Sequence, residues 1–437
     1  MSILSIFANV QWLFIAVFVF LLSGCDVFDT LFDSKKDQIP LPGKRIPILS
    51  LSQEEKSIAK VNRTPWPKPS NPGPWLQAAR FATHHAGLVP LGSCLKTVWQ
   101  CNPGSQGIVL SPPLLTEKVL YVFNADGYVY ALSRMGETLW RTQVAKEECL
   151  GGGLCADTTG HLYVTTGSRS LSCLDQQTGR CLWKAPLGAP SHSPPVVSQH
   201  YVASLNMMNQ LEVFDTRTGK VLWDHTGLST ETHMLGGSTP AICGNCIVVA
   251  YSSGEVIALS LDSGDVLWQQ SGAPVNSIEA AYHLSHIRAH PIIYDNKVYT
   301  FSYNDQLSCF DLTTGHIVWK KPIGGVHTPV IVANTLYCLS KNNCLIAMDA
   351  GTGATAWSKE LPLHTERGSS WAGPVAGGRF LYVTGVNKCL LALDPMKKGS
   401  IAYTYPLDRE TELPPIIACG AMAVMTHYGR LIFFVGQ

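Results

Sequence analysis

Cysteine and histidine are the residues of this chain whose types and spacing could support metal or redox chemistry. Cys243 and Cys246 form a Cys-x-x-Cys pair, which suits a metal ion or a reversible disulfide. The sequence contains no second pair of this kind to complete a zinc site, and the Gly-Asn between the two cysteines is typical of a hairpin turn. We therefore interpret the pair as residues on adjacent strands, with a cross-strand disulfide as the alternative in an oxidising compartment.

Three histidines lie close together in the sequence, at His283, His286 and His290. Imidazole is a common metal ligand, and a single loop could gather the three rings. No acidic residue accompanies them at the helical offset that zinc sites of the His-Glu-x-x-His type use. An exposed loop surface is therefore the favoured interpretation, and a metal site is the alternative.

The composition argues against several classes of function. Apolar residues make up 46% of the chain and charged residues 14%, which predicts a well-buried core. The formal net charge of +1 gives no electrostatic reason to expect nucleic acid as a partner. Neither a Gly-x-Ser-x-Gly nucleophile elbow nor a Walker loop occurs in the sequence, so the common hydrolase and nucleotidase motifs are missing.

The amino terminus has the pattern of a lipoprotein leader. The first 24 residues carry no charge, and residues 12–22 form a dense apolar run that is short for a membrane span. The letters LSGC follow at residues 22–25 and resemble the lipobox of bacterial lipoproteins, in which the leader is cleaved and the cysteine is lipidated. We predict a signal peptide over residues 1–24 and an acylated Cys25, with a plain membrane anchor as the alternative.

Two features of this leader depart from the common pattern. No Lys or Arg precedes the apolar run, where a signal peptide normally carries one. Asp26 resembles the residue that keeps enteric lipoproteins in the inner membrane, so the inner membrane is an alternative to the outer one. Residues 25–91 are rich in proline, as in TPWPKPSNPGPW, and predict a partly stiff tether with a short helix near residues 53–60.

Residues 92–437 contain an internal repeat. Its most regular part is a strand, a turn with Gly, and a second strand that ends in an aromatic residue, about 40 to 50 residues from the next one. The repeats end at Trp140, Trp183, Trp223, Trp268, Trp319, Trp357 and Tyr403, as in LEVFDTRTGKVLW and LSCFDLTTGHIVW. Another apolar pair of strands precedes each ending, and a proline opens most of them, at Pro113, Pro195, Pro240, Pro291, Pro329, Pro374 and Pro415.

Four short strands per repeat at this spacing predict an all-β fold, an eight-bladed β-propeller. The last unit, residues 414–434, supplies three strands, and the segment CLKTVW that ends at Trp99 offers the fourth. A blade made from both ends of the chain would remove the open edges of the outermost sheets. We interpret the repeated Trp residues as packing residues that cap the outer edge, and Cys173 and Cys309 as small apolar residues at a position that is Ala in other repeats.

The repeat is similar to the ALDxxTGxxxW repeat of quinoprotein alcohol dehydrogenases, which bind pyrroloquinoline quinone and calcium in an eight-bladed ring. Those enzymes have an adjacent Cys-Cys pair and long inserts between blades, and this sequence has neither. A quinoprotein-like enzyme is therefore the alternative function, and a propeller that binds another envelope protein or a cell-wall component is a weaker one.

The lipobox, the tether pieces PLPGKRI and WPKPSNPG, the lean propeller and the segment TGKVLWDHTGLSTETHMLGGSTPAI together resemble the BamB family of lipoproteins. The resemblance implies a non-catalytic scaffold without a cofactor, held at the periplasmic face of the outer membrane. It implies docking on the POTRA domains of BamA, the barrel-forming partner, in complex with other subunits of the machinery that assembles β-barrel proteins. A homo-oligomer is not expected.

In enteric members of that family, two inter-blade loops carry the docking. The first corresponds to residues 232–240 here and would place its contacts on Thr232, Met234 and Leu235, of which only Met234 keeps the apolar character well. The second corresponds to residues 285–288, where His286 and Arg288 stand in place of two carboxylates. We expect the location of docking to persist with changed charges, because a buried ion pair needs both members.

Overall fold

The computed structural model describes residues 65–69, 73–103, 111–146, 149, 151–229, 237–271, 287–362, 371–385 and 387–437, all within one compact unit, residues 58–437. The predicted signal peptide, Cys25, the helix near residues 53–60 and most of the tether lie outside the described residues. The described residues form strands, with two 3-10 turns at Pro395–Lys397 and His427–Gly429. Among them, no helix has the length and apolar character needed to cross a membrane.

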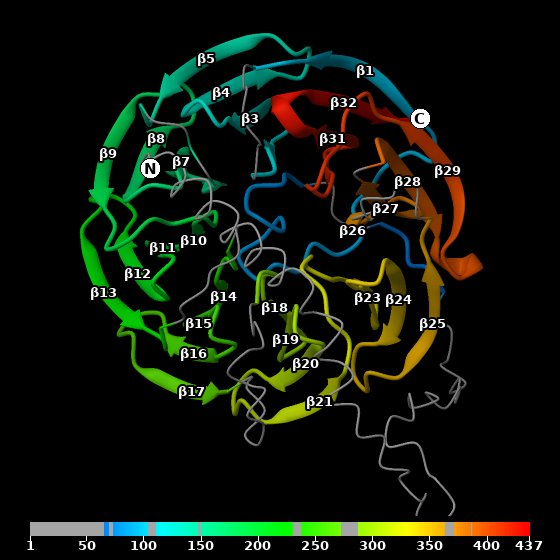
Figure 1. Cartoon of the computed structure of the whole chain (residues 1–437). Helices are drawn as coiled ribbons and strands as arrows, with labels where there is room; N and C mark the ends of the chain where they lie inside the picture. Colours follow the sequence, from blue (N-terminus) through cyan, green and yellow to red (C-terminus); the bar gives the residue numbers. More distant parts are fainter. Residues whose placement is uncertain are drawn as a thin grey trace, which may run out of the picture. The chain divides into compact units, whose positions relative to one another are not determined.

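Eight four-stranded antiparallel sheets form a ring (Figure 1), so the predicted eight-bladed β-propeller is confirmed. Blade 1 contains β2 (Leu114–Leu115), β3 (Val119–Phe123), β4 (Tyr128–Ser133) and β5 (Thr138–Gln143). Blade 2 contains β6 (Gly153–Ala156), β7 (His161–Thr165), β8 (Ser170–Asp175) and β9 (Cys181–Pro186). Blade 3 contains β10 (Val196–Ser198), β11 (Tyr201–Leu205), β12 (Gln210–Asp215) and β13 (Val221–Thr226).

The next four blades repeat this order. Blade 4 contains β14 (Ala241–Cys243), β15 (Cys246–Ala250), β16 (Val256–Ser260) and β17 (Val266–Gln270). Blade 5 contains β18 (Ile292–Tyr294), β19 (Lys297–Ser302), β20 (Gln306–Asp311) and β21 (Ile317–Lys321). Blade 6 contains β22 (Val330–Val332), β23 (Thr335–Leu339), β24 (Cys344–Asp349) and β25 (Thr355–Glu360). Blade 7 contains β26 (Trp371–Gly377), β27 (Phe380–Gly385), β28 (Cys389–Asp394) and β29 (Ser400–Pro406).

Blade 8 is built from both ends of the described chain, as the sequence predicts. It contains β30 (Ile416–Ala418), β31 (Ala421–Met425), β32 (Leu431–Gly436) and, as its outer strand, β1 (Leu95–Cys101). β1 pairs antiparallel with β32 from Leu95 opposite Gly436 to Cys101 opposite Leu431. This pairing closes the ring, because blade 1 follows β1 on one side and blade 7 precedes β30 on the other (Figure 1).

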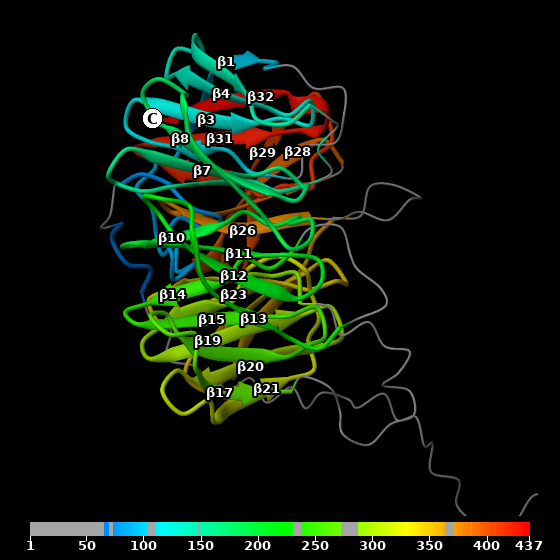
Figure 2. The same cartoon turned by 90° about the vertical axis from the view of Figure 1, so that its left-hand side faces the viewer.

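Residues 73–91, which we call the plug, lie within the ring although the sequence assigns them to the tether. Figure 1 shows this segment as the blue trace at the centre of the ring, and Figure 2 shows it toward one face. The plug forms hydrogen bonds with blades 1 to 7 in the order in which they occur along the chain. The paired residues are Trp75 with Leu115, Leu76 with Ala156, Gln77 with Val197, Ala82 with Ile242, Thr83 with Ile293, His85 with Ile331 and Val89 with Ala376.

A buried arginine holds the two limbs of the plug together. Arg80 is 1% exposed, and its guanidinium donates to the carbonyl oxygen of Ala86 at 3.0 Å and to that of Gly73 at 3.2 Å. A buried guanidinium requires such acceptors, because an unpaired buried charge is strongly unfavourable. The plug therefore has a fixed internal conformation in addition to its contacts with the blades.

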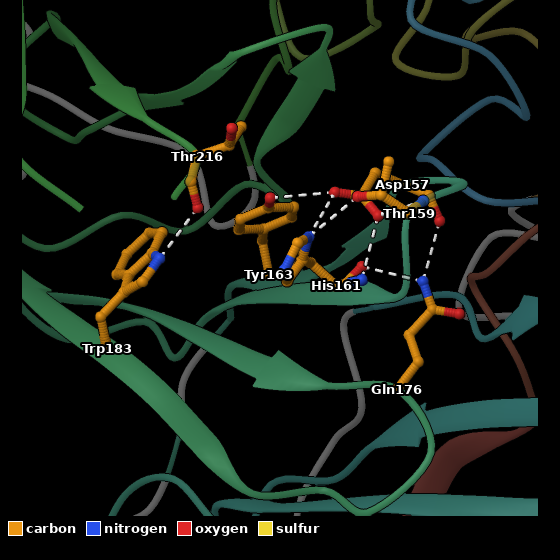
Figure 3. A network of polar contacts seen from close by, with 7 residues as sticks. All are labelled: Asp157, Thr159, His161, Tyr163, Gln176, Trp183 and Thr216. Atoms are coloured by element: carbon orange, nitrogen blue, oxygen red, sulfur yellow. Dashed lines mark hydrogen bonds and ion pairs between the residues drawn. The ribbon is translucent and has the colours of Figure 1, made fainter. Parts of the chain in front are cut away.

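The repeated Trp residues join neighbouring blades. Each indole packs on the turn glycine of the following blade, and most of them donate Nε1–H to a backbone oxygen there. Figure 3 shows one such bond, from Trp183 of blade 2 to the Thr216 oxygen of blade 3 at 2.9 Å. The seven Trp–Gly pairs are Trp99 with Gly136, Trp140 with Gly179, Trp183 with Gly219, Trp223 with Gly264, Trp268 with Gly315, Trp319 with Gly353 and Trp357 with Gly399.

The Trp residues are packing residues on the outer strands, as the sequence predicts, and the structure adds that each one packs on the next blade. The turn glycine has a positive φ and no side chain, so the indole reaches the neighbouring blade: a Cβ on Gly179 would lie 2.5 Å from the Trp140 ring. The predicted small residues are confirmed opposite the indoles, where Cys173 faces Trp183 and Cys309 faces Trp319, each 0% exposed.

A β-bulge accompanies the aromatic residue in every blade. In blade 4, Ala258 lies opposite Trp268 but Leu259 lies opposite Val266, so Leu267 is an extra residue on the outer strand. The same shift recurs in the other blades, and the extra residue in blade 4 is 53% exposed. A bulge twists an edge strand and interrupts its row of backbone groups, which protects the eight outer edges from pairing with other chains.

Candidate functional site

A cavity of about 120 Å³ lies at the hub between the plug and the chain segments that lead into the inner strands. The plug and the connections into several blades form its lining, and each of these connections contributes a different set of side chains. The polar and aromatic lining residues are Trp75, His84, His192, Arg288, His290, His327, Thr328 and Glu412. Alanine and proline residues form most of the remaining wall, among them Ala78, Ala79 and Ala86 of the plug.

The strand order decides on which side the cavity lies. Neighbouring strands are antiparallel, so every connection from the fourth strand of one blade to the first strand of the next emerges on one face, which we call the connection face. His290, His327 and Glu412 stand at the end of such connections, directly before inner strands. The plug instead forms backbone hydrogen bonds with residues inside the inner strands or at the strand end away from the connection face, as at Leu115 and Ala376. The plug thus floors the cavity, and its other side is toward the connection face.

The protonation of two hub histidines follows from their backbone contacts. His84 is 1% exposed, and its Nδ1 lies 2.9 Å from the carbonyl oxygen of Pro291, which can only accept. Nδ1 of His84 therefore carries the proton, and its Nε2 is an acceptor. Nδ1 of His290 accepts the backbone N–H of Thr239 at 2.9 Å, so its Nε2 carries the proton and is a donor.

Burial keeps these rings neutral. Desolvation lowers the pKa of His84 to about 4, although the bond to Pro291 opposes the shift. Desolvation, helped by the charge of Arg288, lowers the pKa of His327 to about 3. The pKa of His290 is also well below its ordinary value, first by burial and then through His84 and Arg288. The rings of His84 and His290 are 5.1 Å apart, which neutral imidazoles tolerate.

Among the described residues that line the cavity, Arg288 is the one cationic side chain. Burial lowers the pKa of Arg288 and the nearby Glu412 raises it, and a guanidinium stays protonated at neutral pH in either case. No ion pair joins Arg288 to a carboxylate in the part of the chain that the structure describes. Glu412, the one acidic residue of the described lining, is exposed.

The structure brings together the described ends of the two predicted docking loops. Ser238 donates to the Ala289 oxygen at 3.2 Å, beside the bond from Thr239 to His290. Arg288, which the resemblance places in the second loop, lines the hub cavity. The other predicted contact residues, Thr232, Met234, Leu235 and His286, lie outside the described residues, as does His283.

Sequence reasoning did not find Trp75, His84, His192, His327 or Glu412. A signal for the last three exists in the sequence: a titratable residue stands one or two positions before the first proline that opens an inner strand, as in His192-Ser193-Pro194 and Glu412-Leu413-Pro414. No comparable signal marks Trp75 or His84, because the plug has no repeat.

The Cys243–Cys246 pair lies as predicted on paired strands, directly opposite each other across the β14–β15 turn. The structure has both as thiols and not as a disulfide. Burial, with the neighbouring Cys243, raises the pKa of Cys246 to about 11, so that this thiol is protonated and a poor metal ligand at neutral pH. Within the described chain, no group of three or more His, Cys, Asp or Glu side chains is arranged to hold a metal ion.

A second polar cluster, at the β6–β7 turn, contains the residue types of a catalytic triad (Figure 3). Thr159 Oγ1 and Asp157 Oδ2 both contact Nδ1 of His161, at 2.9 and 3.0 Å. A triad needs the hydroxyl and the carboxylate on opposite ring nitrogens, so this arrangement cannot activate Thr159 as a nucleophile. Burial opposes ionisation of Asp157, but hydrogen bonds from His161 and Thr159 keep its pKa below the ordinary value. The cluster stabilises the turn.

Comparison with known proteins gives a consistent result. Residues 125–359 match the family model described as outer membrane protein assembly factor BamB. The assembly factor BamB of Yersinia pestis is 28% identical over 218 residues, 47% of this chain and 55% of that protein. The BamB of Escherichia coli strain K12 is 26% identical over 242 residues, 53% of this chain and 62% of that protein. The chain thus spans less than two thirds of the length of these relatives.

Solved structures share the fold at low sequence identity. The crystal structure of BamB from Moraxella catarrhalis has a TM-score of 0.68 at 19% identity and covers 78% of this chain and 100% of that chain. A europium-containing methanol dehydrogenase also has a TM-score of 0.68, at 14% identity, and covers 84% and 98% of the two chains. Because a BamB protein and a dehydrogenase match equally well, the structural likeness shows the fold alone.

Proposed function

Because this chain belongs to the family of outer membrane protein assembly factor BamB, we propose that it is a non-catalytic scaffold in the assembly of β-barrel proteins into the outer membrane. In this proposal a lipid on Cys25 anchors it at the periplasmic face, and the connection face of the propeller docks on the POTRA domains of a BamA-like barrel protein. The match of residues 125–359 to the family model is the observation that carries the proposal.

The geometry of the connection face supports docking there. The bonds from Ser238 to Ala289 and from Thr239 to His290 join the two predicted docking loops, which follow different blades. Ile287 and Ala289 are 6% and 1% exposed, so the second loop is anchored in the core next to Arg288. In this proposal the anchored ends of the two loops reduce the entropy lost on binding.

The hub supports a scaffold over a quinoprotein-like enzyme. Pockets for small molecules and cofactors are usually about 300–1,000 Å³. The hub cavity of about 120 Å³ is smaller, and the plug that floors it is held by seven blades. A tricyclic quinone would therefore have to displace the plug. The lining also lacks the adjacent cysteine pair of the quinoprotein dehydrogenases.

Capture from detergent-solubilised membranes tests the proposal. The tagged full chain is expected to retain a POTRA-containing barrel protein, identified by mass spectrometry. The double substitution Met234→Asp and Leu235→Asp is expected to reduce that capture at least tenfold, because a charge buried in an interface is unfavourable. Met135→Asp is the matched control: Met135 is 72% exposed and lies in the β4–β5 turn, on the face opposite the connections.

Two results would contradict this proposal. Equal capture by the double variant and the wild type would place the docking surface elsewhere. A quinone absorbance in the purified protein, with alcohol oxidation that depends on calcium, would replace the scaffold by the enzyme.

A further inference from the structure

The hub cavity contains more hydrogen-bond donors than the surrounding protein uses. Trp75 is 3% exposed and its Nε1–H has no partner in the structure, while Nε2–H of His290 also faces no acceptor that the structure records. Arg288 forms no hydrogen bond within the described residues. One acceptor, Nε2 of the fully buried His84, is likewise unpartnered. Each buried polar atom left in this way destabilises the fold, so a group that satisfies several of them would be bound.

The charges of the cavity indicate which kind of ligand it would bind. His84, His290 and His327 are neutral because their pKa values are lowered, so Arg288 is the one cationic side chain in the described lining of the cavity. Glu412 also lines the cavity, but it is exposed, so solvent weakens its field relative to that of the more buried Arg288. A cation would meet the guanidinium and N–H donors, and therefore an anion that accepts hydrogen bonds is favoured.

We propose that the hub cavity is a binding site for a carboxylate group, held by the Arg288 guanidinium, His290 Nε2–H and Trp75 Nε1–H. The planar guanidinium matches the two oxygens of a carboxylate. His84 Nε2 accepts from a hydroxyl next to the carboxylate, so a 2-hydroxy acid such as glycolate fits better than acetate. Arg288 also belongs to the second predicted docking loop, but the binding of a free carboxylate at the hub does not depend on the proposed function.

The size of the cavity limits the ligand. One water molecule occupies about 30 Å³ in the liquid, so about 120 Å³ accommodates a group of at least about four non-hydrogen atoms. Acetate and glycolate are in this range, as is the end of an Asp or Glu side chain. The carboxylate thus comes either from a free small acid or from a protein docked on the connection face, and this second source rests on the proposed function.

The first experiment uses the purified full chain and two matched ligands, acetate and its neutral isostere acetamide, followed by ligand-observed NMR. Acetate is expected to bind and acetamide to bind at least tenfold more weakly, because charge-assisted hydrogen bonds are the stronger ones. Glycolate is expected to bind more tightly than acetate in the wild type and equally in a His84→Phe variant. Equal binding of acetate and acetamide would overturn the proposal.

Two substitutions, one that removes a positive charge and one that removes a negative charge, test whether the cavity binds the carboxylate through Arg288. Arg288→Gln is expected to weaken acetate binding at least tenfold, and Glu412→Gln to strengthen it severalfold, since the competing carboxylate at the mouth is removed. Arg288→Lys keeps the charge without the planar fork and is expected to fall between the wild type and Arg288→Gln. Circular dichroism checks that each variant is folded. If acetate binds Arg288→Gln as well as the wild type, or Zn²⁺ binds where acetate does not, the proposal is wrong.

Capture of the POTRA-containing barrel protein distinguishes the two sources. If the carboxylate belongs to the partner, Arg288→Gln lowers capture and acetate competes with it. If it belongs to a free acid, capture is unchanged while acetate binding is lost. Acetate binding by the isolated protein needs no partner, so its failure is distinct from a failure of the docking proposal.

Discussion

The rim and the hub of this propeller are built in different ways. At the rim, seven Trp–Gly contacts repeat one geometry from blade to blade, with the same bulge and the same turn. At the hub, the plug meets a different residue of each blade, and the connections into the blades contribute different sets of polar side chains to the cavity. The repeated part provides the stability of a ring, and the unrepeated part provides the cavity for which we propose a ligand.

The junction between blades 7 and 8 shows what the repeat requires. Blade 8 has no turn between its third and fourth strands, because β32 and β1 come from opposite ends of the described chain. Tyr403, which takes the place of the Trp in blade 7, therefore has no turn glycine to pack on and is 45% exposed. Tyr405 instead accepts a hydrogen bond from the Leu95 backbone at 3.2 Å. The Trp–Gly contact occurs only where a continuous turn presents the glycine.

The largest expected effect comes from removing one Trp–Gly contact. Trp268→Ala is expected to lower the free energy of unfolding by about 4 kcal/mol, since Trp268 is 7% exposed, contacts Gly315 and donates to the Leu312 oxygen at 2.7 Å. Tyr403→Ala at the open junction is expected to cost less than about 1 kcal/mol. Urea denaturation measures both, and equal losses would contradict the difference between the two kinds of junction.

A hub prediction follows from His84. Its pKa is about 4 in the folded protein and ordinarily 6.5, so the unfolded chain binds the proton more tightly. This difference has no effect above about pH 7 and destabilises the fold as the pH falls from 6.5 to 4, by about 3 kcal/mol in total. His84→Asn cannot titrate, and its amide can still donate to Pro291.

Denaturation at pH 7 and pH 4 measures this effect. The loss of stability between the two pH values is expected to be about 3 kcal/mol smaller in His84→Asn than in the wild type. The same substitution at the exposed His200 is the control and should leave the loss unchanged. An equal loss in all three proteins would show that the hub histidines do not oppose protonation.

The smallest effect distinguishes steric overlap with a neighbouring side chain from backbone strain at the turn glycines. Gly179 and Gly244 both have positive φ, of 71° and 58°, so alanine at either position is strained by about 1–2 kcal/mol. Only at Gly179 would the methyl group meet a neighbour, the Trp140 ring at 2.5 Å; at Gly244 nothing lies within 4 Å. Gly179→Ala is expected to be less stable than Gly244→Ala by about 2 kcal/mol in thermal denaturation. Equal costs would show that the indole moves freely.

The sequence by itself determined the blades and their closure. Short alternating strands, turn glycines and regularly spaced aromatic residues encode local pairing between segments that are neighbours in the chain, and a one-residue slip in a strand would reverse its buried face. The missing fourth strand of the last repeat was likewise visible in the segment at Trp99. The inter-blade role of the Trp residues was not visible, because a repeated Trp is equally consistent with an edge cap and with a contact to the next blade.

Only the tertiary structure determined the arrangement of the plug and of the cavity residues at the hub. The plug contacts blades that are far away in sequence, with His85 and Ile331 separated by 246 positions, and each contact is made once, so no periodicity marks it. Its prolines predict a spacer because proline prevents regular secondary structure. An irregular backbone is also what the plug needs in order to contact seven different inner strands in turn. Arg288 belongs to a predicted docking loop and His290 follows that loop in sequence. The ring brings both together with His84, His327 and Glu412, since closure of the propeller places the ends of separate connections around one axis.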